Sequence, residues 1–323
     1  MKKLIKLSAT LLLSLGLFAC GANTENTNTE TTTQTAEQTT QETITISHSR
    51  GESTIKLNPQ KVVVFDMGML DIMKNLDIDA EFALPLNGVP SYITGYEDAL
   101  NVGDLKEPNF EEIYTFKPDV IFISGRQADF YDQFNEIAPT VYVDLDYKNY
   151  MEDLKTNLTN IGKLFDKEQL AMEKYDELMA KIDEAKQKVD KIDDKALIIL
   201  TNGGKLSVYG PGSRFGLIYD FLGYKEADEN IYEEGEEIPT HGKEISYEYI
   251  SQINPDILFV VDRDSVVGGE GNAATTLDND LIKNTNAYKN DKIVMLNAEY
   301  WYIAPGGLTA LNNMVDEAIS FLN

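Results

Sequence analysis

Arginine is rare in this chain, and its positions predict a site for an anion. Of the 28 lysines and arginines, only four are arginine: Arg50, Arg126, Arg214 and Arg263. Arg50 lies near the start of the folded region and is expected on the surface, whereas the other three lie at predicted strand or turn ends. Arginine there provides a rigid fork that grips anionic oxygens and stacks on flat rings. The competing interpretation is a structural ion pair for each, which the acids on both sides of Arg263 favour.

Histidine is equally rare, and one of the two histidines is a candidate ligand. His48 lies on a predicted exposed strand and is expected on the surface, whereas His241 precedes Gly242 in a predicted loop. Loops on rigid scaffolds carry a large share of functional side chains. A run of three aromatic residues, Tyr300-Trp301-Tyr302, is a second candidate. If this run is a strand, Trp301 points away from both tyrosines, either into the core or as a wall for a ring.

The elements that position these residues read as alternating strands and helices. Residues 43–46 alternate as an exposed strand does, and residues 61–65 form an apolar run typical of a buried parallel strand. A helical pattern follows from residue 70 to residue 76. This order of elements predicts an α/β fold with mostly parallel sheets.

An internal repeat divides the folded region into two similar lobes. Residues 110–126 read FEEIYTFKPDVIFISGR, and residues 247–263 read YEYISQINPDILFVVDR, with no gap between the copies. Each copy predicts a helix, a Pro-Asp boundary, a strand and a final arginine. Because ligands gather at the carboxyl ends of parallel strands, Arg126 and Arg263 are expected at equivalent ligand-facing positions. The alternative is that both copies arose only because a helix, a Pro-Asp boundary and a strand are a common sequence of elements in α/β proteins.

A long polar helix is predicted between the two copies. No Gly or Pro occurs between Lys163 and Asn202, and apolar residues from Leu170 to Ile192 fall mostly on one stripe. A flexible hinge would be rich in Gly and Ser instead. We therefore expect a rigid spine over residues 163–193, an N-terminal lobe over 43–162, a C-terminal lobe over 194–323 and little closure of the lobes.

The first 42 residues read as an export signal, an anchor and a tether. Three lysines precede a short apolar run that ends in Leu17-Phe18-Ala19-Cys20-Gly21, with Cys20 the only cysteine. This pattern resembles a bacterial lipobox, which implies a signal peptide over 1–19 and lipidation of Cys20; the alternative is an ordinary signal peptide with an incidental cysteine. Residues 21–42 contain no large apolar side chain and predict a disordered tether over 20–42.

The net charge excludes general binding to nucleic acid. The chain carries −26, and removing the three lysines of residues 1–19 changes this to −29. Such a surface repels a polyanion. An anionic ligand must then be held by a local cluster of arginines, because charges beyond about 8 Å are largely screened at physiological salt.

Six motifs in order resemble one family, the bacterial solute-binding proteins of iron–siderophore and cobalamin importers. They are VVVFDMGMLD (62–71), NVGDLKEPNFEEI (101–113), ISGRQ (123–127), YGPGSRFG (209–216), THGKEISYEYI (240–250) and YWYIAPGG (300–307). Together they are similar to the catecholate branch, which contains enterobactin- and petrobactin-like binders. The resemblance covers residues 43–323 and implies two Rossmann-like lobes joined by a single long spine helix.

The resemblance also implies a function and a set of ligands. It implies a monomeric, non-enzymatic receptor, lipid-anchored on the extracytoplasmic face of the cell membrane, that delivers a ferric siderophore to an ABC transporter permease and holds no intrinsic cofactor. In the resembling proteins a loop histidine and the second tyrosine of a Tyr-Trp-Tyr run ligate iron; carried over, these are His241 and Tyr302. The remaining expected ligand-binding residues are Arg126, Arg214, Arg263, Tyr300 and Trp301.

Other ligands and other classes of protein remain open on the sequence. The same scaffold could bind haem, cobalamin or a hydroxamate chelate, although these would leave three arginines in surplus. Two histidines do not supply a His-rich zinc or manganese site.

A surface hydrolase would need a nucleophile, and no Gly-x-Ser-x-Gly elbow occurs, so a pair of Ser213 with His241 is the only candidate. A structural adhesin is disfavoured by the paired α/β repeat.

Overall fold

The N-terminal lobe is built around a parallel sheet. The computed structural model describes residues 42–233, 235–269 and 271–322. The strand order is β5-β4-β3-β6-β7, and every neighbouring pair is parallel. These strands are β3 (Lys61–Val64), β4 (Glu81–Leu84), β5 (Leu100–Asn101), β6 (Val120–Ile123) and β7 (Thr140–Tyr142). The central strands β3 and β6 are almost wholly buried, as apolar strands covered on both faces must be.

The C-terminal lobe contains a mixed sheet with a parallel centre. Its order is β11-β9-β8-β12-β13, with β10 also pairing with β8. β12 is parallel to β8 and β13, whereas β9 is antiparallel to β8 and β11. The strands are β8 (Lys195–Asn202), β9 (Lys205–Tyr209), β10 (Lys225–Glu226), β11 (Lys243–Ile245), β12 (Ile257–Asp262) and β13 (Ile293–Leu296). A separate antiparallel hairpin of β1 (Thr43–His48) and β2 (Gly51–Lys56) begins the described chain.

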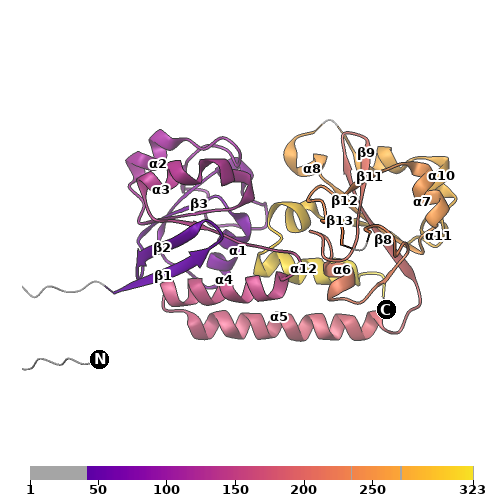
Figure 1. Cartoon of the computed structure of the whole chain (residues 1–323), viewed down its shortest axis with the longest axis horizontal. Helices are drawn as coiled ribbons and strands as arrows, with labels where there is room; N and C mark the ends of the chain where they lie inside the picture. Colours follow the sequence, from indigo (N-terminus) through magenta and orange to yellow (C-terminus); the bar gives the residue numbers. More distant parts are fainter. Residues whose placement is uncertain (1–41, 234, 270, 323) are drawn as a thin grey trace, which may run out of the picture. The chain divides into compact units, whose positions relative to one another are not determined.

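Helices connect and cover these sheets (Figure 1). The N-terminal half contains α1 (Met67–Asn75), η1 (Leu86–Gly88), α2 (Phe110–Phe116), η2 (Gly125–Phe130), α3 (Tyr131–Ile137), α4 (Tyr150–Leu164) and α5 (Glu168–Val189). The C-terminal half contains α6 (Leu217–Asp220), α7 (Tyr247–Ile253), α8 (Asp264–Val267), α9 (Ala273–Leu277), α10 (Asp280–Lys283), α11 (Asn286–Lys289), η3 (Glu299–Ile303) and α12 (Leu308–Ala318). The α/β architecture with two lobes, predicted from the sequence, is confirmed. Within the described ranges, no helix has both the length and the apolar character that a membrane span requires.

The internal repeat appears as two copies of one helix–strand unit. α2 and β6 in the first copy correspond to α7 and β12 in the second. Each helix ends at a residue in the left-handed conformation, Lys117 with φ 56° and Asn254 with φ 51°. Both residues precede the proline of the Pro-Asp boundary, where a right-handed helical conformation is disfavoured. The equivalent ends of β6 and β12 therefore carry Arg126 and Arg263 into equivalent loops.

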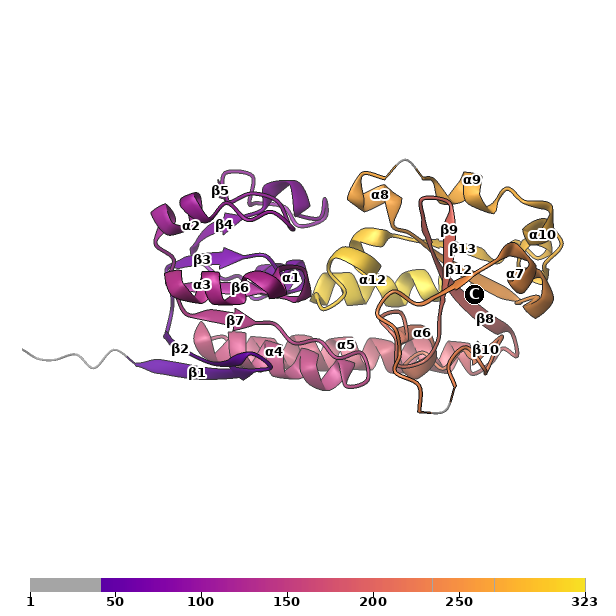
Figure 2. The same ribbon diagram turned by 45° about the horizontal axis from the view of Figure 1, so that its top comes forward.

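The predicted spine is α5, which lies beneath both lobes in Figure 1 and runs from one lobe to the other in Figure 2. It runs from Glu168 to Val189 and is therefore shorter than the range 163–193 expected from the sequence. Lys163 and Leu164 belong to α4, and the chain breaks its helical course before α5 begins. Leu178 and Ile182 lie on the buried stripe of α5, in agreement with its apolar pattern.

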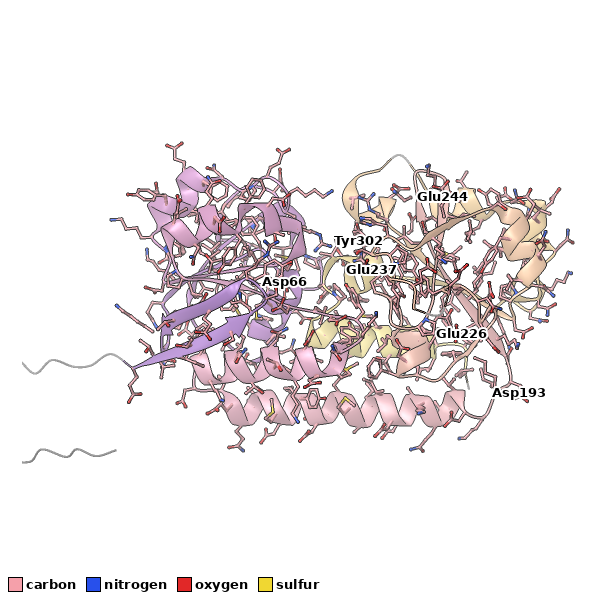
Figure 3. The ribbon with its side chains drawn as sticks, viewed as in Figure 1. Asp66, Asp193, Glu226, Glu237, Glu244 and Tyr302 are labelled. Carbon is pink, nitrogen blue, oxygen red and sulfur yellow. The ribbon has the colours of Figure 1, made fainter. Side chains whose placement is uncertain are left out.

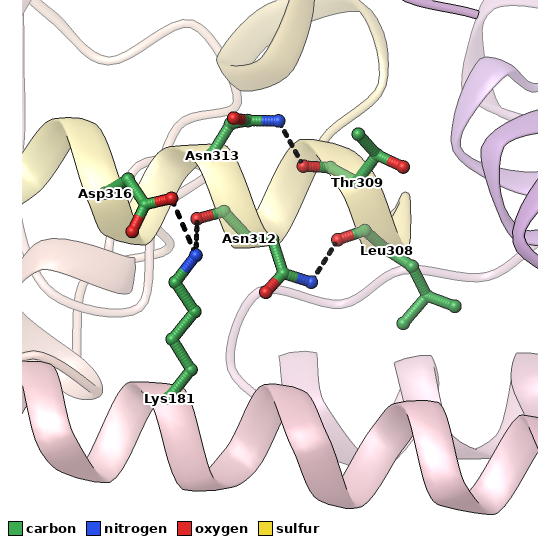
Figure 4. Close-up of polar contacts among 6 residues, drawn as sticks. All are labelled: Lys181, Leu308, Thr309, Asn312, Asn313 and Asp316. Atoms are coloured by element: carbon green, nitrogen blue, oxygen red, sulfur yellow. Dashed lines mark hydrogen bonds and ion pairs between the residues drawn. The ribbon is translucent and has the colours of Figure 1, made fainter.

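Polar contacts fasten α5 to α12 (Figure 4). The Lys181 ammonium donates to Asn312 O at 2.9 Å and forms an ion pair with Asp316 at 2.7 Å. Two amide side chains on α12 bond back along the helix to the carbonyl oxygens of Leu308 and Thr309. Exposed ion pairs contribute little stability, so these contacts mainly fix the register of two helices that already pack together.

One hydrophobic core extends through both lobes. It includes Val62 and Phe122 of the N-terminal sheet, Leu178 and Ile182 of α5, and Phe259 of the C-terminal sheet. The other face of each sheet has a separate core of its own. Separating the lobes would expose the shared apolar surface to water, at a cost of about 25 cal/mol for each Å². This geometry favours a stiff frame over a hinge.

The predicted signal peptide, Cys20 and all of the predicted tether except Glu42 lie outside the described residues.

A buried carboxylate joins α1 to the start of α12. Asp71 is 1% exposed, and its Oδ2 accepts a hydrogen bond from Ala310 N at 2.9 Å. Its Oδ1 accepts from the Asn75 amide at 2.7 Å. The carboxylate thereby satisfies one of the free N–H groups at the start of α12, and its negative charge suits that end of the helix dipole. Burial raises the pKa of Asp71, against the opposing effect of these hydrogen bonds.

We expect Asp71→Ala to lower the free energy of unfolding by about 2 kcal/mol, because it leaves the Ala310 N–H without its partner and removes one of the acceptors of the Asn75 amide. Asp71→Asn keeps one acceptor and should cost less. Since the pKa of Asp71 is raised in the folded protein, the wild type should lose stability relative to Asp71→Asn as the pH rises through that pKa. Urea denaturation at several pH values measures both effects, and equal stability of Asp71→Ala and wild type would contradict the capping role.

Candidate functional site

A cavity of about 670 Å³ lies between the two lobes. Its wall contains five of the residues predicted from the sequence: Arg126, Arg214, His241, Arg263 and Tyr302. Figure 3 shows Asp66 on the N-terminal lobe and Tyr302 on the C-terminal side, toward the region between the lobes. A volume of this size is typical of pockets that hold a small organic ligand.

The three arginines reach this cavity from different elements. Arg126 follows β6 in η2, and its repeat equivalent Arg263 follows β12 at the start of α8. Arg214 lies in the turn between β9 and α6, where the buried Ser213 hydroxyl donates to Gly210 O at 2.5 Å. This bond fixes the turn, so the guanidinium of Arg214 is presented from a rigid backbone. It also leaves Ser213 within its own turn and away from the cavity wall that contains His241.

Tyr302 lies on η3, a π-helical turn that receives hydrogen bonds from residues of both lobes. Arg126 donates to Tyr302 O at 2.7 Å and to Ile303 O at 3.4 Å. Arg214 donates to the same Tyr302 carbonyl at 3.2 Å. From the N-terminal lobe, Ser91 donates through its backbone N–H and its hydroxyl to the Glu299 carboxylate, at 2.9 and 2.7 Å. π-Helical turns are rare and occur frequently at functional sites.

All three guanidinium groups also approach the Tyr302 ring. The Cζ atoms of Arg126, Arg214 and Arg263 lie 5.6, 4.3 and 5.5 Å from the ring centroid. Arg263 Nε additionally donates to the Tyr302 hydroxyl at 2.9 Å. Three like charges repel one another, and a π face attracts each of them. The arrangement is therefore a concentrated positive site with one phenol at its centre.

The arginines change the acidity of this phenol. Burial raises the pKa of Tyr302, but the hydrogen bond from Arg263 and the charges of all three arginines outweigh burial, so the pKa is lowered overall. Burial also lowers the pKa of Arg126, and the nearby charge of Arg214 lowers it further. Arginine nevertheless stays protonated in proteins, so the positive field persists.

The three arginines of the cavity do not form the structural ion pairs that were the competing interpretation of the sequence. Among the described residues, no ion pair involves Arg126, Arg214 or Arg263. The acids beside Arg263 serve the backbone instead: Asp262 accepts from Ala273 N at 2.9 Å, and Asp264 accepts from Gly203 N at 2.6 Å. Arg214 also has a buried Nε that has no hydrogen-bond partner within the described chain. The positive charge of the three arginines is therefore not neutralised by an acidic side chain and remains available to an anionic ligand.

His241 reaches the cavity on the loop before β11. The side chain is exposed, and Gly242 next to it has a positive φ of 68°. A Cβ at Gly242 would lie 2.7 Å from Val208 O, so only glycine allows this close approach of the loop to β9. Within the described ranges no cluster of three or more His, Cys, Asp or Glu side chains could hold a metal ion. His241 and Tyr302 both line this cavity, so a chelate bound there is the way in which they would share one metal ion.

Tyr300 and Trp301 are not brought to the cavity. The run that could have been a strand is helical, so Trp301 turns into the core, where it is fully buried and donates to the Glu317 carboxylate at 2.8 Å. Tyr300 packs against Tyr92, with ring centroids 4.9 Å apart. The structure thus places both residues outside the lining of the cavity, and their predicted contact with ligand finds no support in it.

Several wall residues were missed from the sequence. Tyr142 and Tyr147 supply aromatic faces, Lys106 adds a cation, and Asp66 and Asp144 add acids. Tyr142 ends β7, so the rule that ligands gather at the carboxyl ends of parallel strands could have found it. Lys106 lies on an irregular loop that this rule does not reach, although it belongs to the motif of residues 101–113.

Comparisons with known proteins agree with this geometry. The model of the periplasmic binding protein family matches residues 62–300. The petrobactin-binding protein YclQ of Bacillus subtilis is 38% identical over 98% of both chains, and its crystal structure superposes with a TM-score of 0.83, covering 87% of this chain and 99% of that one. The ferric-anguibactin-binding protein FatB of Vibrio anguillarum is 33% identical over 85% of this chain and 86% of its own. The catecholate-siderophore binding protein VctP of Vibrio cholerae superposes with a TM-score of 0.78 at 36% identity, covering 86% of this chain and all of VctP.

We expect Tyr302 to ionise at a lower pH than an ordinary tyrosine, whose pKa is about 10. The difference between ultraviolet titrations of the wild type and Tyr302→Phe isolates this one phenol. Arg263→Gln should move the titration to higher pH, because it removes a hydrogen bond and a charge that favour the phenolate. Lys205→Gln, which removes an exposed cation outside the cavity, is the matched control. A Tyr302 titration that does not respond to Arg263→Gln would show that the arginines do not control the phenol.

Proposed function

The chain belongs to the periplasmic binding protein family, and from that membership we propose that it is a high-affinity extracytoplasmic receptor for ferric siderophores of the catecholate type. Such a receptor would deliver its cargo to the permease of an ABC importer for iron uptake. The observation that carries this proposal is the convergence of Arg126, Arg214 and Arg263 on Tyr302 in a cavity between two lobes.

The chemistry of a ferric catecholate matches this site. A ferric tris-catecholate is a trianion with flat rings, and guanidinium groups bind anionic oxygens and stack on ring faces. Tyr142 and Tyr147 provide further aromatic surface in the same cavity. Haem and cobalamin carry less negative charge at the chelate, so three unpaired arginines would be surplus for them.

We propose that His241 and Tyr302 complete the coordination of iron when the chelate is a tetradentate bis-catecholate, since a tris-catecholate fills all six positions by itself. Fe(III) is a hard cation that prefers oxygen, and it binds the phenolate form of tyrosine. The three arginines lower the pKa of Tyr302, which reduces the cost of forming that phenolate. A tetradentate chelator leaves two positions on octahedral iron, the number that one histidine and one tyrosine can fill.

The relatives support a receptor rather than an enzyme. YclQ is named for binding petrobactin, FatB for binding ferric anguibactin and VctP for binding catecholate siderophores. Ser213, the single candidate nucleophile, is buried and bonded within its own turn. Binding without turnover also agrees with the stiff frame, since a preformed site lowers the ordering cost of association.

We also propose a setting for the receptor from its first residues. Cleavage before Cys20 and lipidation of its thiol would anchor a monomer to the extracytoplasmic face of the cell membrane. Residues 20–42 would form the tether, residues 43–162 and 194–323 the lobes, and the segment between them the spine. The receptor would then hold its ligand close to the permease.

A panel of ferric siderophores tests the cargo. We expect ferric enterobactin or ferric petrobactin to quench the fluorescence of Trp301, the only tryptophan, with sub-micromolar affinity. A ferric trihydroxamate, haem and cobalamin serve as controls. Replacing Arg126, Arg214 or Arg263 by Ala should weaken catecholate binding by about 1.5–3 kcal/mol each, the worth of a charge-assisted hydrogen bond. Absence of quenching by catecholates, or tighter binding of haem, would overturn the catecholate assignment.

Direct ligation of iron has a spectroscopic test. With a tetradentate ferric catecholate bound, His241→Ala and Tyr302→Phe should each shift the charge-transfer band of the iron, because each removes one ligand. Tyr300→Phe is the matched control, since Tyr300 belongs to the same turn but does not line the cavity. An unchanged spectrum in both ligand variants would mean that the protein holds the chelate without ligating its iron.

A further inference from the structure

The turn between β1 and β2 brings a fourth arginine, Arg50, next to two residues that line the cavity. Ser49 lines the cavity, and its backbone N–H donates to Asp144 Oδ2 at 2.8 Å. Next to it, the guanidinium carbon of Arg50 lies 5.5 Å from the ring centroid of Tyr142. Asp144 and Tyr142 both line the same cavity. The turn is therefore attached to the wall at two points, although its residues lie far from β7 in the sequence.

His48 fixes the conformation of this turn. The Ser53 hydroxyl donates to Thr140 O at 2.6 Å, so its remaining contact with His48 Nε2, at 3.1 Å, must be one in which the imidazole donates. His48 Nδ1 is then free to accept from Arg50 N at 3.2 Å. Both ring nitrogens are thus committed in the neutral imidazole, and the backbone of Arg50 is held in place.

The guanidinium of Arg50 remains available for an anion. The side chain is exposed, and no ion pair among the described residues includes it. The contact with the Tyr142 ring holds the guanidinium group beside the cavity, and its five N–H donors exceed what this one contact can use. In this respect Arg50 repeats the relation of the other three arginines to Tyr302, with a second tyrosine of the cavity.

We propose that Arg50 is a fourth ligand-binding arginine, placed at the wall of the cavity by Tyr142, and that it selects for anionic ferric chelates. This inference rests on the proposed function, and it extends the site to the hairpin that begins the described chain. An exposed cation beside the cavity also counters the long-range repulsion that a chain of −26 exerts on an anionic ligand. The expectation from the sequence that Arg50 is on the surface agrees with its exposure; its position beside the cavity was missed.

Fluorescence titration with ferric enterobactin and ferric petrobactin tests this role. Arg50→Gln should weaken binding by about three- to tenfold, the range for a partly exposed charge-assisted contact. It should also reduce the dependence of the affinity on potassium chloride concentration, because one ligand-facing cation is lost. Arg50→Lys should be intermediate, since it keeps the charge and loses the flat fork. Tyr142→Leu should weaken binding in the wild type by more than in Arg50→Gln, because the two side chains act together.

Lys155→Gln is the matched control. The Lys155 ammonium stacks on Tyr175 at 5.3 Å, so it is also a cation on a tyrosine, and neither residue lines the cavity. Its affinity and salt dependence should equal those of the wild type. If the wild type binds and Arg50→Gln binds equally well with the same salt dependence, the role of Arg50 is overturned and the proposed function stands. If the wild type binds neither chelate, both proposals fall together.

Discussion

The crowding of three guanidinium groups around one phenol is the constraint on which the rest of this structure depends. Three cations within about 6 Å of one ring repel one another, and burial of Arg126 adds to that cost. The opposing interactions are the Tyr302 carbonyl, its hydroxyl and its ring, each of which faces at least one arginine. A site that concentrates like charge in this way is poised to be neutralised by an anionic ligand. Among the described residues no acid forms an ion pair with these arginines, and the aspartates on both sides of Arg263 are bonded to backbone N–H groups instead.

Holding such a site open requires a frame that does not relax. The frame is the core shared by the two lobes, together with α5 and α12. Arg126 comes from one lobe, and Arg214 and Arg263 come from the other. Without a ligand the repulsion among these charges favours movement of the lobes away from each other. The Asp71 contact with α12 and the Ser91 contact with Glu299 oppose that movement from the N-terminal side. Preorganisation of this kind reduces what binding must spend on ordering side chains.

Charge on two length scales reconciles an acidic protein with an anionic cargo. The chain as a whole is strongly negative, which favours solubility, but screening limits that field to short range. Within the cavity the balance changes, because Lys106 and three arginines outnumber the acids Asp66, Asp144 and Asp146 in the wall. The acids lie beside helix starts and turns, where they also cap backbone N–H groups, as Asp66 does for Met69. Local structure thus explains why they persist in a site for an anion.

The sequence by itself determined the local pattern of this protein. Apolar runs predicted the buried strands, the Pro-Asp repeat predicted two equivalent lobes, and the economy of arginine identified Arg126, Arg214 and Arg263, because each of these signals acts over a few neighbouring residues. Only the tertiary structure decided which residues from distant parts of the chain contact one another. It turned residues 299–303 into a π-helical turn that buries Trp301 and exposes Tyr302 to the cavity, and it set Arg50 against Tyr142. The physical reason is that such contacts depend on how segments distant in the chain pack together. The local periodicity of hydrophobic residues gives no information about that packing.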